Sequence, residues 1–156
     1  MEFADEFFLL YLGDDSGAWG ELEDDAKAAL LVQATLAIDR LDNIKRGFKG
    51  VKSSPSQPNA FPRDGETFIP EKVRMACALE ALALADEEAA ARRSLRRQGV
   101  SGMSVGNASE NYLRFGLFDS NTRSVAQVDF SESLASGEAF GLMMVYLDVK
   151  GVYVIR

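Results

Sequence analysis

Two helix-forming apolar runs, separated by a proline-rich polar loop, constrain the fold of this chain more than any other feature. The loop, residues 51–68, contains three prolines and shows little apolar periodicity. Before it, apolar residues recur at the spacing of one helix face between residues 24 and 44: Ala26, Leu30, Ala34, Ala37, Leu41 and Ile44. After it, Pro70 suits the first turn of a helix that we expect to run from Glu71 to Arg97. This second helix has two apolar faces, so we expect it at the centre of the core.

The amino-acid composition limits the number of domains and the kinds of site that this chain can have. The 156 residues suit one domain, and a hydrophobic content of 47% is enough for a core. The single cysteine, Cys77, cannot form an internal disulfide, and the chain has no histidine. Because the commonest general base and metal ligand are missing, we expect no catalytic site, no metal and no cofactor, and therefore not an enzyme.

Charge is distributed unevenly along the chain. The net charge of −7 argues against a general nucleic-acid binder, since such domains carry a basic face. Residues 1–39 hold ten acids against one lysine, whereas residues 40–52 hold five bases against one acid. Such polarisation favours a complementary neighbour, including another copy of the chain. With no signal peptide and no long apolar run, we expect a soluble protein made in a cytoplasm and no membrane partner.

The remaining elements are shorter. Residues 2–12 read as a helix with Phe3, Phe7 and Leu10 on one apolar stripe, and Trp19 as a core anchor. Beyond Gly99, we expect extended chain or a hairpin around residues 106–107, irregular chain over 119–133, a helix over 136–147 and a strand over 152–155.

These elements predict a mainly α fold. We expect a small helical core of three or four helices with a β-hairpin or extended arm and a short C-terminal strand. The predicted division is a helical core over 1–98, an arm over 99–135, and a C-terminal helix and strand over 136–156.

Three groups of residues are candidate sites, and each has a structural alternative. Arg92, Arg93, Arg96 and Arg97 project from adjacent turns, either toward phosphates and an acidic partner or as cations at a helix C-terminus. Phe61, Pro62 and Arg63 form either a docking loop for a partner or an anchor that folds the long loop onto the core. Phe48, among the bases of residues 40–52, is either part of a nucleic-acid patch or buried, and we favour burial because one ring is a poor stacking platform.

Glu80 lies on an apolar face of the expected central helix. A buried carboxylate needs a partner. We therefore predict a buried ion pair of Glu80 with Arg40 or Arg63.

Several short pieces carry a resemblance to a known family. They are Gln33-Ala34-Thr35, Asp39-Arg40-Leu41, Phe48-Lys49-Gly50, Phe61-Pro62-Arg63, Ile69-Pro70, Gly99-Val100 and Ser104-Val105-Gly106. In these the chain resembles head–tail connector (adaptor) proteins of tailed phages, which are often labelled putative DnaT-like single-stranded-DNA-binding proteins.

The resemblance implies a structural protein of the virion neck, assembled in the host cytoplasm. Its partners would be other copies in a ring, a dodecamer by the portal's symmetry, together with the portal protein and a tail-side connector or tail terminator. DNA would pass through the channel without a specific site. The interface residues would be the four arginines together with Met103, Val105 and Tyr112. The second hypothesis, which follows the family label, is a single-stranded-DNA-binding module; a small enzyme is a minor third.

Overall fold

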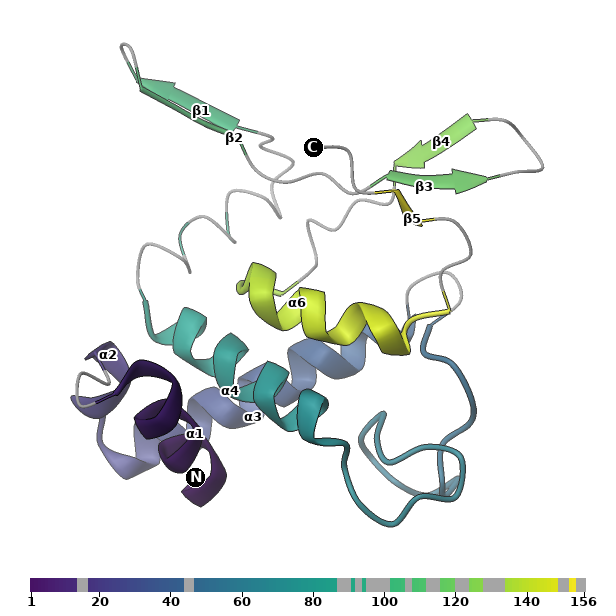
Figure 1. Cartoon of the computed structure of the whole chain (residues 1–156), viewed down its shortest axis with the longest axis horizontal. Helices are drawn as coiled ribbons and strands as arrows, with labels where there is room; N and C mark the ends of the chain where they lie inside the picture. Colours follow the sequence, from purple (N-terminus) through teal and green to yellow (C-terminus); the bar gives the residue numbers. More distant parts are fainter. Residues whose placement is uncertain are drawn as a thin grey trace.

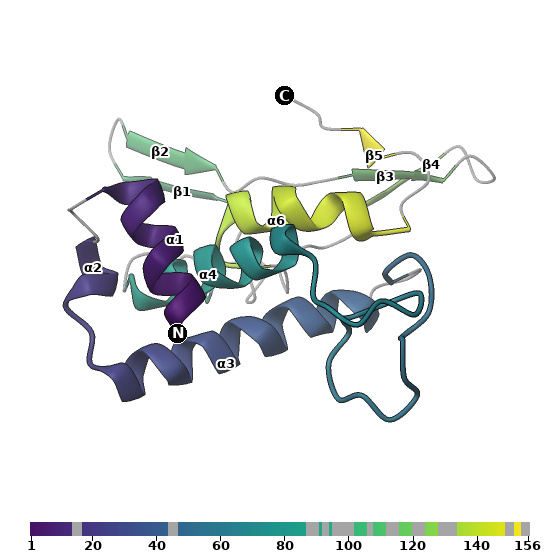
Figure 2. The same cartoon turned by 60° about the horizontal axis from the view of Figure 1, so that its bottom comes forward.

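The helices pack in layers, with α4 (Glu71–Ala85) between α3 (Asp24–Arg40) and α6 (Gly137–Met143) (Figures 1 and 2). The structure is a computed structural model, and it describes residues 1–13, 17–43, 47–86, 91, 94, 102–105, 108–111, 116–119, 124–127, 134–148 and 152–153. Helices α1 (Glu2–Leu12) and α2 (Gly17–Gly20) close one end of the layers against α4. The predicted mainly α fold with a small helical core is confirmed.

Local signals explain where the helices begin. Asp24 and Asp25 place carboxylates in the first turn of α3, where they favour the helix dipole. Pro70 precedes α4, as expected of a residue that lacks an amide donor. In α6, the Ser136 side chain accepts a hydrogen bond from the amide of Ala139 and so caps the helix. Short 3-10 turns, η1 (Leu41–Asn43) and η3 (Met144–Tyr146), extend α3 and α6.

The core lies on both sides of α4, as predicted. Val73, Ala76 and Leu79 are buried on α4, and Trp19 is buried beneath α1, where its ring meets Phe8 at 5.2 Å between centroids. Leu134, Phe140, Met143 and Leu147 belong to the same apolar cluster. The helical core therefore includes part of the C-terminal segment and is not confined to residues 1–98.

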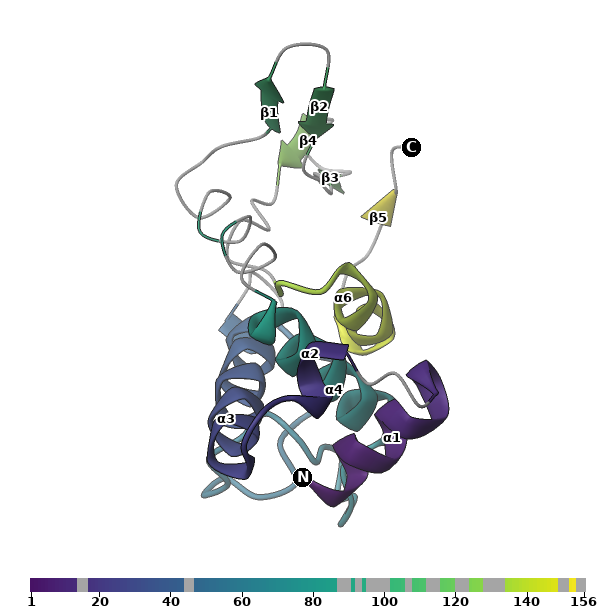
Figure 3. The same cartoon turned by 90° about the vertical axis from the view of Figure 1, so that its left-hand side faces the viewer.

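The strands lie to one side of this helical core (Figure 3). Strand β1 (Gly102–Val105) pairs antiparallel with β2 (Ala108–Asn111), and Val105 faces Ala108 across residues 106–107. Of the two arrangements expected here, extended chain or a hairpin around residues 106–107, the structure has the hairpin. Strand β5 (Val152–Tyr153) pairs with β3 (Gly116–Asp119), which also pairs with β4 (Ser124–Gln127). A terminal strand was predicted; the β3–β4 hairpin was not, and residues 124–127 are not irregular.

Two further expectations are wrong. The second long helix does not run unbroken to Arg97, because Asp86 has an extended backbone (φ −82°, ψ 115°), although Ala91 and Ser94 are again helical. In α1, the buried pair is Ala4 and Phe8, while Leu10 is 79% exposed. The apolar stripe predicted from Phe3, Phe7 and Leu10 therefore meets the core only in part, since Phe7 packs against it and Leu10 does not.

Candidate functional site

The loop between α3 and α4, residues 47–70, is held by one buried arginine. Arg63 is 9% exposed, and its guanidinium forms a salt bridge with Asp42 at 3.4 Å. The same guanidinium donates hydrogen bonds to four backbone carbonyls, those of Phe48, Lys49, Gly50 and Ala60. Carbonyls from two stretches of the loop thus converge on one cation.

The rings of this loop are buried as well. Phe61 is 6% exposed, and its ring lies 4.9 Å from that of Phe48 and 5.4 Å from that of Tyr146, measured between centroids. Phe61, Pro62 and Arg63 therefore form the intramolecular anchor rather than the docking loop. The same contacts confirm that Phe48, at 4% exposure, is buried and not part of a stacking patch.

Glu80 is fully buried, but its predicted pairing is wrong. Arg40 is exposed at the end of α3, and Arg63 is bound to Asp42. Instead, the two carboxylate oxygens of Glu80 accept hydrogen bonds from the amides of Ala135 and Ser136, each at 2.9 Å. The carboxylate thereby fixes the start of α6 on α4, which is a structural role.

The predicted partner-interface residues contribute little to a described site. Arg92, Arg93, Arg96, Arg97 and Tyr112 lie outside the described residues. Met103 and Val105 lie in β1, for which the structure describes the backbone alone. A metal or catalytic cluster has no support in the described part of the chain, which holds no group of three or more candidate metal-ligating side chains. None of the described helices is long and apolar enough to cross a membrane.

Three aromatic side chains lie along one side of α1. Phe3, Phe7 and Tyr11 are spaced by four residues, so their rings follow one face of the helix; we call them the aromatic row. The Phe3 and Phe7 rings lie 6.1 Å apart and 6° from parallel, and those of Phe7 and Tyr11 lie 5.3 Å apart and 17° from parallel. Tyr11 is 52% exposed. The row therefore offers the Tyr11 ring to a partner, while Phe3 and Phe7 are half-buried behind it.

Polar contacts orient both ends of this row. The Tyr11 hydroxyl donates to the Glu138 carboxylate at 3.0 Å, and this hydrogen bond raises the pKa of Tyr11 above its ordinary value. At the other end, the guanidinium carbon of Arg74 lies 3.8 Å from the centroid of the Phe3 ring. A guanidinium stacked on a ring presents its charge beside an aromatic face.

One of the three acidic side chains of α1, Asp5, is engaged on the other side of the helix. Asp5 lies two residues after Phe3, so it points to the opposite side of α1. There it accepts a hydrogen bond from the Trp19 indole at 2.9 Å and pairs with Lys27 at 3.6 Å.

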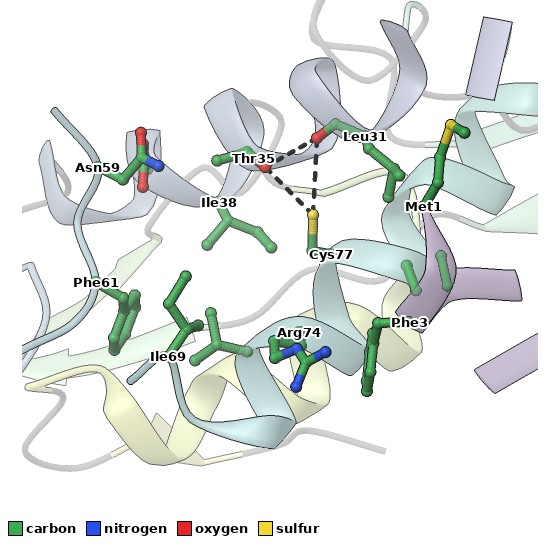
Figure 4. A pocket seen from close by; sticks show the side chains of 14 residues that line it. Met1, Phe3, Leu31, Thr35, Ile38, Asn59, Phe61, Ile69, Arg74 and Cys77 are labelled. Atoms are coloured by element: carbon green, nitrogen blue, oxygen red, sulfur yellow. Dashed lines mark hydrogen bonds between the residues drawn. The ribbon is translucent and has the colours of Figure 1, made fainter. Parts of the chain in front are cut away.

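A pocket adjoins the Phe3 end of the row (Figure 4). It has a volume of about 170 Å³, and we call it the α1–α4 pocket. Four segments contribute its walls: the start of α1, the middle of α3, the 47–70 loop and the first half of α4. Most of the walls are apolar, with Leu31, Ile38, Ile69 and Val73 among them.

Most polar side chains on the α3 wall of the pocket already have hydrogen-bond partners in the protein. The Thr35 hydroxyl donates to the carbonyl of Leu31 at 2.8 Å and lies 3.3 Å from the Cys77 sulfur (Figure 4). Burial raises the pKa of the Cys77 thiol. Asp39 accepts a hydrogen bond from the Ala60 amide at 2.8 Å, while burial raises the pKa of its carboxyl group. Without an activating base, Cys77 shows no arrangement for nucleophilic chemistry among the described residues.

A family model described as "Putative DnaT-like ssDNA binding protein" matches residues 4–140. The chain belongs to this family. No curated protein and no solved structure gives a match. The matched range of this DnaT-like chain begins inside α1, after Phe3, and ends inside α6, so it covers Phe7 and Tyr11 of the aromatic row and the pocket lining apart from Met1 and Phe3.

The match corrects the interpretation of the sequence. The family is described by single-stranded-DNA binding and not by a place in a virion, so the identification as a head–tail connector is wrong. The expected portal ring, tail-side partners and virion role depended on that identification and lose their support with it. The alternative hypothesis, a single-stranded-DNA-binding module, is the one that the family favours.

Sequence reasoning missed the aromatic row. It placed Phe3, Phe7 and Leu10 on one apolar stripe, whereas the aligned rings are those of Phe3, Phe7 and Tyr11. The available signal was that α1 holds more large apolar side chains than one face can bury, so that some of them had to remain exposed.

Proposed function

We propose that this protein binds single-stranded DNA and has no enzymatic activity of its own. The family match supports the ligand class. The observation that carries the site is the aromatic row with Arg74 stacked on its Phe3 end. Bases stack on aromatic side chains in proteins that bind single strands, and a cation beside the rings meets the phosphate backbone.

The exposed ring of Tyr11 provides the direct test. Its replacement in Tyr11→Leu keeps the apolar bulk but removes the stacking surface. Stacking contributes about 1–3 kcal/mol per base, so we expect affinity for a labelled oligothymidylate to fall at least about fivefold in a fluorescence anisotropy titration.

Two variants serve as controls for this test. Tyr11→Phe keeps the ring and loses only the hydroxyl bond to Glu138, so we expect it to bind as wild type does. Leu10→Ala alters the most exposed apolar neighbour on α1 and should also leave affinity unchanged. Equal affinity of Tyr11→Leu and wild type would remove the aromatic row from the site, and no binding by the wild type would reject the function itself.

A further inference from the structure

The α1–α4 pocket lies next to the aromatic row and has mostly apolar walls. These walls limit which chemical groups can enter. Thr35 donates its hydroxyl proton to Leu31, and the Cys77 thiol lies within reach of both the Thr35 hydroxyl and the Leu31 carbonyl. At Thr35 and Cys77 this wall therefore has little hydrogen-bonding capacity to spare, and its charged group, the Asp39 carboxylate, accepts the Ala60 amide at the end of the wall beside the loop. A group that enters deeply must present apolar surface, because a polar group would lose its hydration without compensation.

The mouth of the pocket, in contrast to its walls, carries polar and charged side chains. Arg74 and Asn59 line it from different segments, α4 and the 47–70 loop (Figure 4). Both side chains are exposed. The salt bridges among the described residues do not include Arg74, and the Asn59 side-chain amide makes no hydrogen bond there. The mouth thus presents a cation together with an amide that can both donate and accept.

A nucleotide combines the groups that these two regions accept. The faces of a base are apolar, its edge carries donors and acceptors that an amide can pair, and its phosphate is an anion that a guanidinium binds. An aliphatic side chain from a second copy would fill the apolar slot but would use neither Arg74 nor Asn59. The volume of about 170 Å³ leaves room for one ring system and not for several.

We propose that the α1–α4 pocket holds one unstacked base of a bound single strand, with Asn59 at the base edge and Arg74 on the adjoining phosphate. This assignment rests on the proposed single-stranded-DNA binding and adds to it a specific base site. The strand then continues from the pocket along the aromatic row, because Phe3 belongs to both.

Cys77 allows the occupancy of the pocket to be measured directly. It is the only cysteine of the chain, and it lines the pocket. We expect a short oligothymidylate, at roughly ten times its dissociation constant, to slow alkylation of Cys77 by iodoacetamide about tenfold, because about one pocket in ten then remains free. Binding of the same oligonucleotide is followed in parallel by anisotropy.

Variants separate the base site from general electrostatics. Arg74→Gln should weaken both binding and protection, whereas Lys72→Gln, with the same loss of charge on an exposed residue of α4 outside the pocket, should change neither. Ile69→Trp places a ring at the mouth from a residue that is 42% exposed. It should slow alkylation without DNA and reduce affinity.

The outcomes distinguish this inference from the function on which it rests. Binding by anisotropy with an unchanged alkylation rate would overturn the pocket assignment and leave the proposed function standing, whereas no binding at all would overturn both. Equal protection by an oligonucleotide of abasic sugars would overturn the base assignment. If alkylation of Cys77 became slower with rising protein concentration in the absence of DNA, the pocket would be assigned to a second copy of the chain. That outcome would also overturn the base assignment.

Discussion

Two charged residues that are candidate site residues in the sequence, Arg63 and Glu80, have structural roles in the fold. Arg63 and Glu80 are the two charged side chains that are buried among the described residues. Each binds backbone groups: Arg63 binds loop carbonyls, and Glu80 binds the amides that precede α6. Neither set of contacts is visible in the sequence, because the main-chain atoms, and for Arg63 also the Asp42 carboxylate, are brought near only by the fold.

Removing the Glu80 carboxylate should destabilise the protein. Glu80→Ala leaves the amides of Ala135 and Ser136 without their acceptors, and we expect a loss of about 3 kcal/mol in the free energy of unfolding. Urea denaturation followed by circular dichroism measures it. Glu66→Ala, at an exposed loop position, is the control and should stay within about 0.5 kcal/mol of wild type. Wild-type stability of Glu80→Ala would contradict the burial of this side chain.

The Cys77 thiol should make stability depend on alkaline pH. Its pKa is raised in the folded protein, chiefly by burial, so the unfolded chain loses the thiol proton first as pH rises. Any stability that Cys77 contributes is therefore complete below the ordinary thiol pKa and decreases as pH rises toward the raised value.

The difference in unfolding free energy between wild type and Cys77→Ala isolates this effect from other titrating groups. We expect the wild type to lose stability relative to Cys77→Ala as the pH rises above the ordinary thiol pKa. A difference that is constant with pH would show that the thiol titrates alike in both states.

At the scale of elements, α6 tests how a short helix is held in place. Its seven residues are too few to be stable alone, so its cap and its packing on α4 decide whether it forms. Ser136→Ala removes the side-chain acceptor of the Ala139 amide and should cost about 1 kcal/mol in urea denaturation. Thr67→Ala, at an exposed loop position, should cost almost nothing. Equal stability of the two variants would mean that packing alone holds α6.

The elements also show what the sequence could and could not predict. Start signals are local, so the first residues of α1, α3 and α4 and the turn between β1 and β2 follow from nearby residues. The break at Asp86 could not be predicted, because the residues before it are good helix formers. The β3–β4 hairpin lacks a glycine turn signal in residues 120–123.

The candidate site depended still more on tertiary contacts. Which side of α1 faces the core is decided by Ala4 and Phe8, since both are buried while Leu10 is exposed. The periodicity of Phe3, Phe7 and Leu10 fits a core-facing stripe equally well. The sequence could therefore predict the helix but not the aromatic row, which ends at the exposed Tyr11.

At the scale of the whole molecule, the net charge of −7 sets a limit on how this protein can bind DNA. A negative chain repels phosphates at long range, so affinity must come from short-range stacking and from a few cations. Arg74 is the described cation that lies in contact with both the row and the pocket. Binding through these two features differs from binding in a basic groove, which neutralises many phosphates.

Salt dependence distinguishes these two modes of binding. Each neutralised phosphate of a single strand adds about 0.7 to the magnitude of the slope of log affinity against log salt, so a site that relies on Arg74 and on stacking predicts a slope no steeper than about −2. Anisotropy titrations of oligothymidylate over a range of sodium chloride concentrations measure it, and Arg74→Gln should make the slope shallower by about 0.7. A slope steeper than about −5 would mean that a basic surface, such as residues 40–52 with residues 92–97, carries the binding instead of the aromatic row.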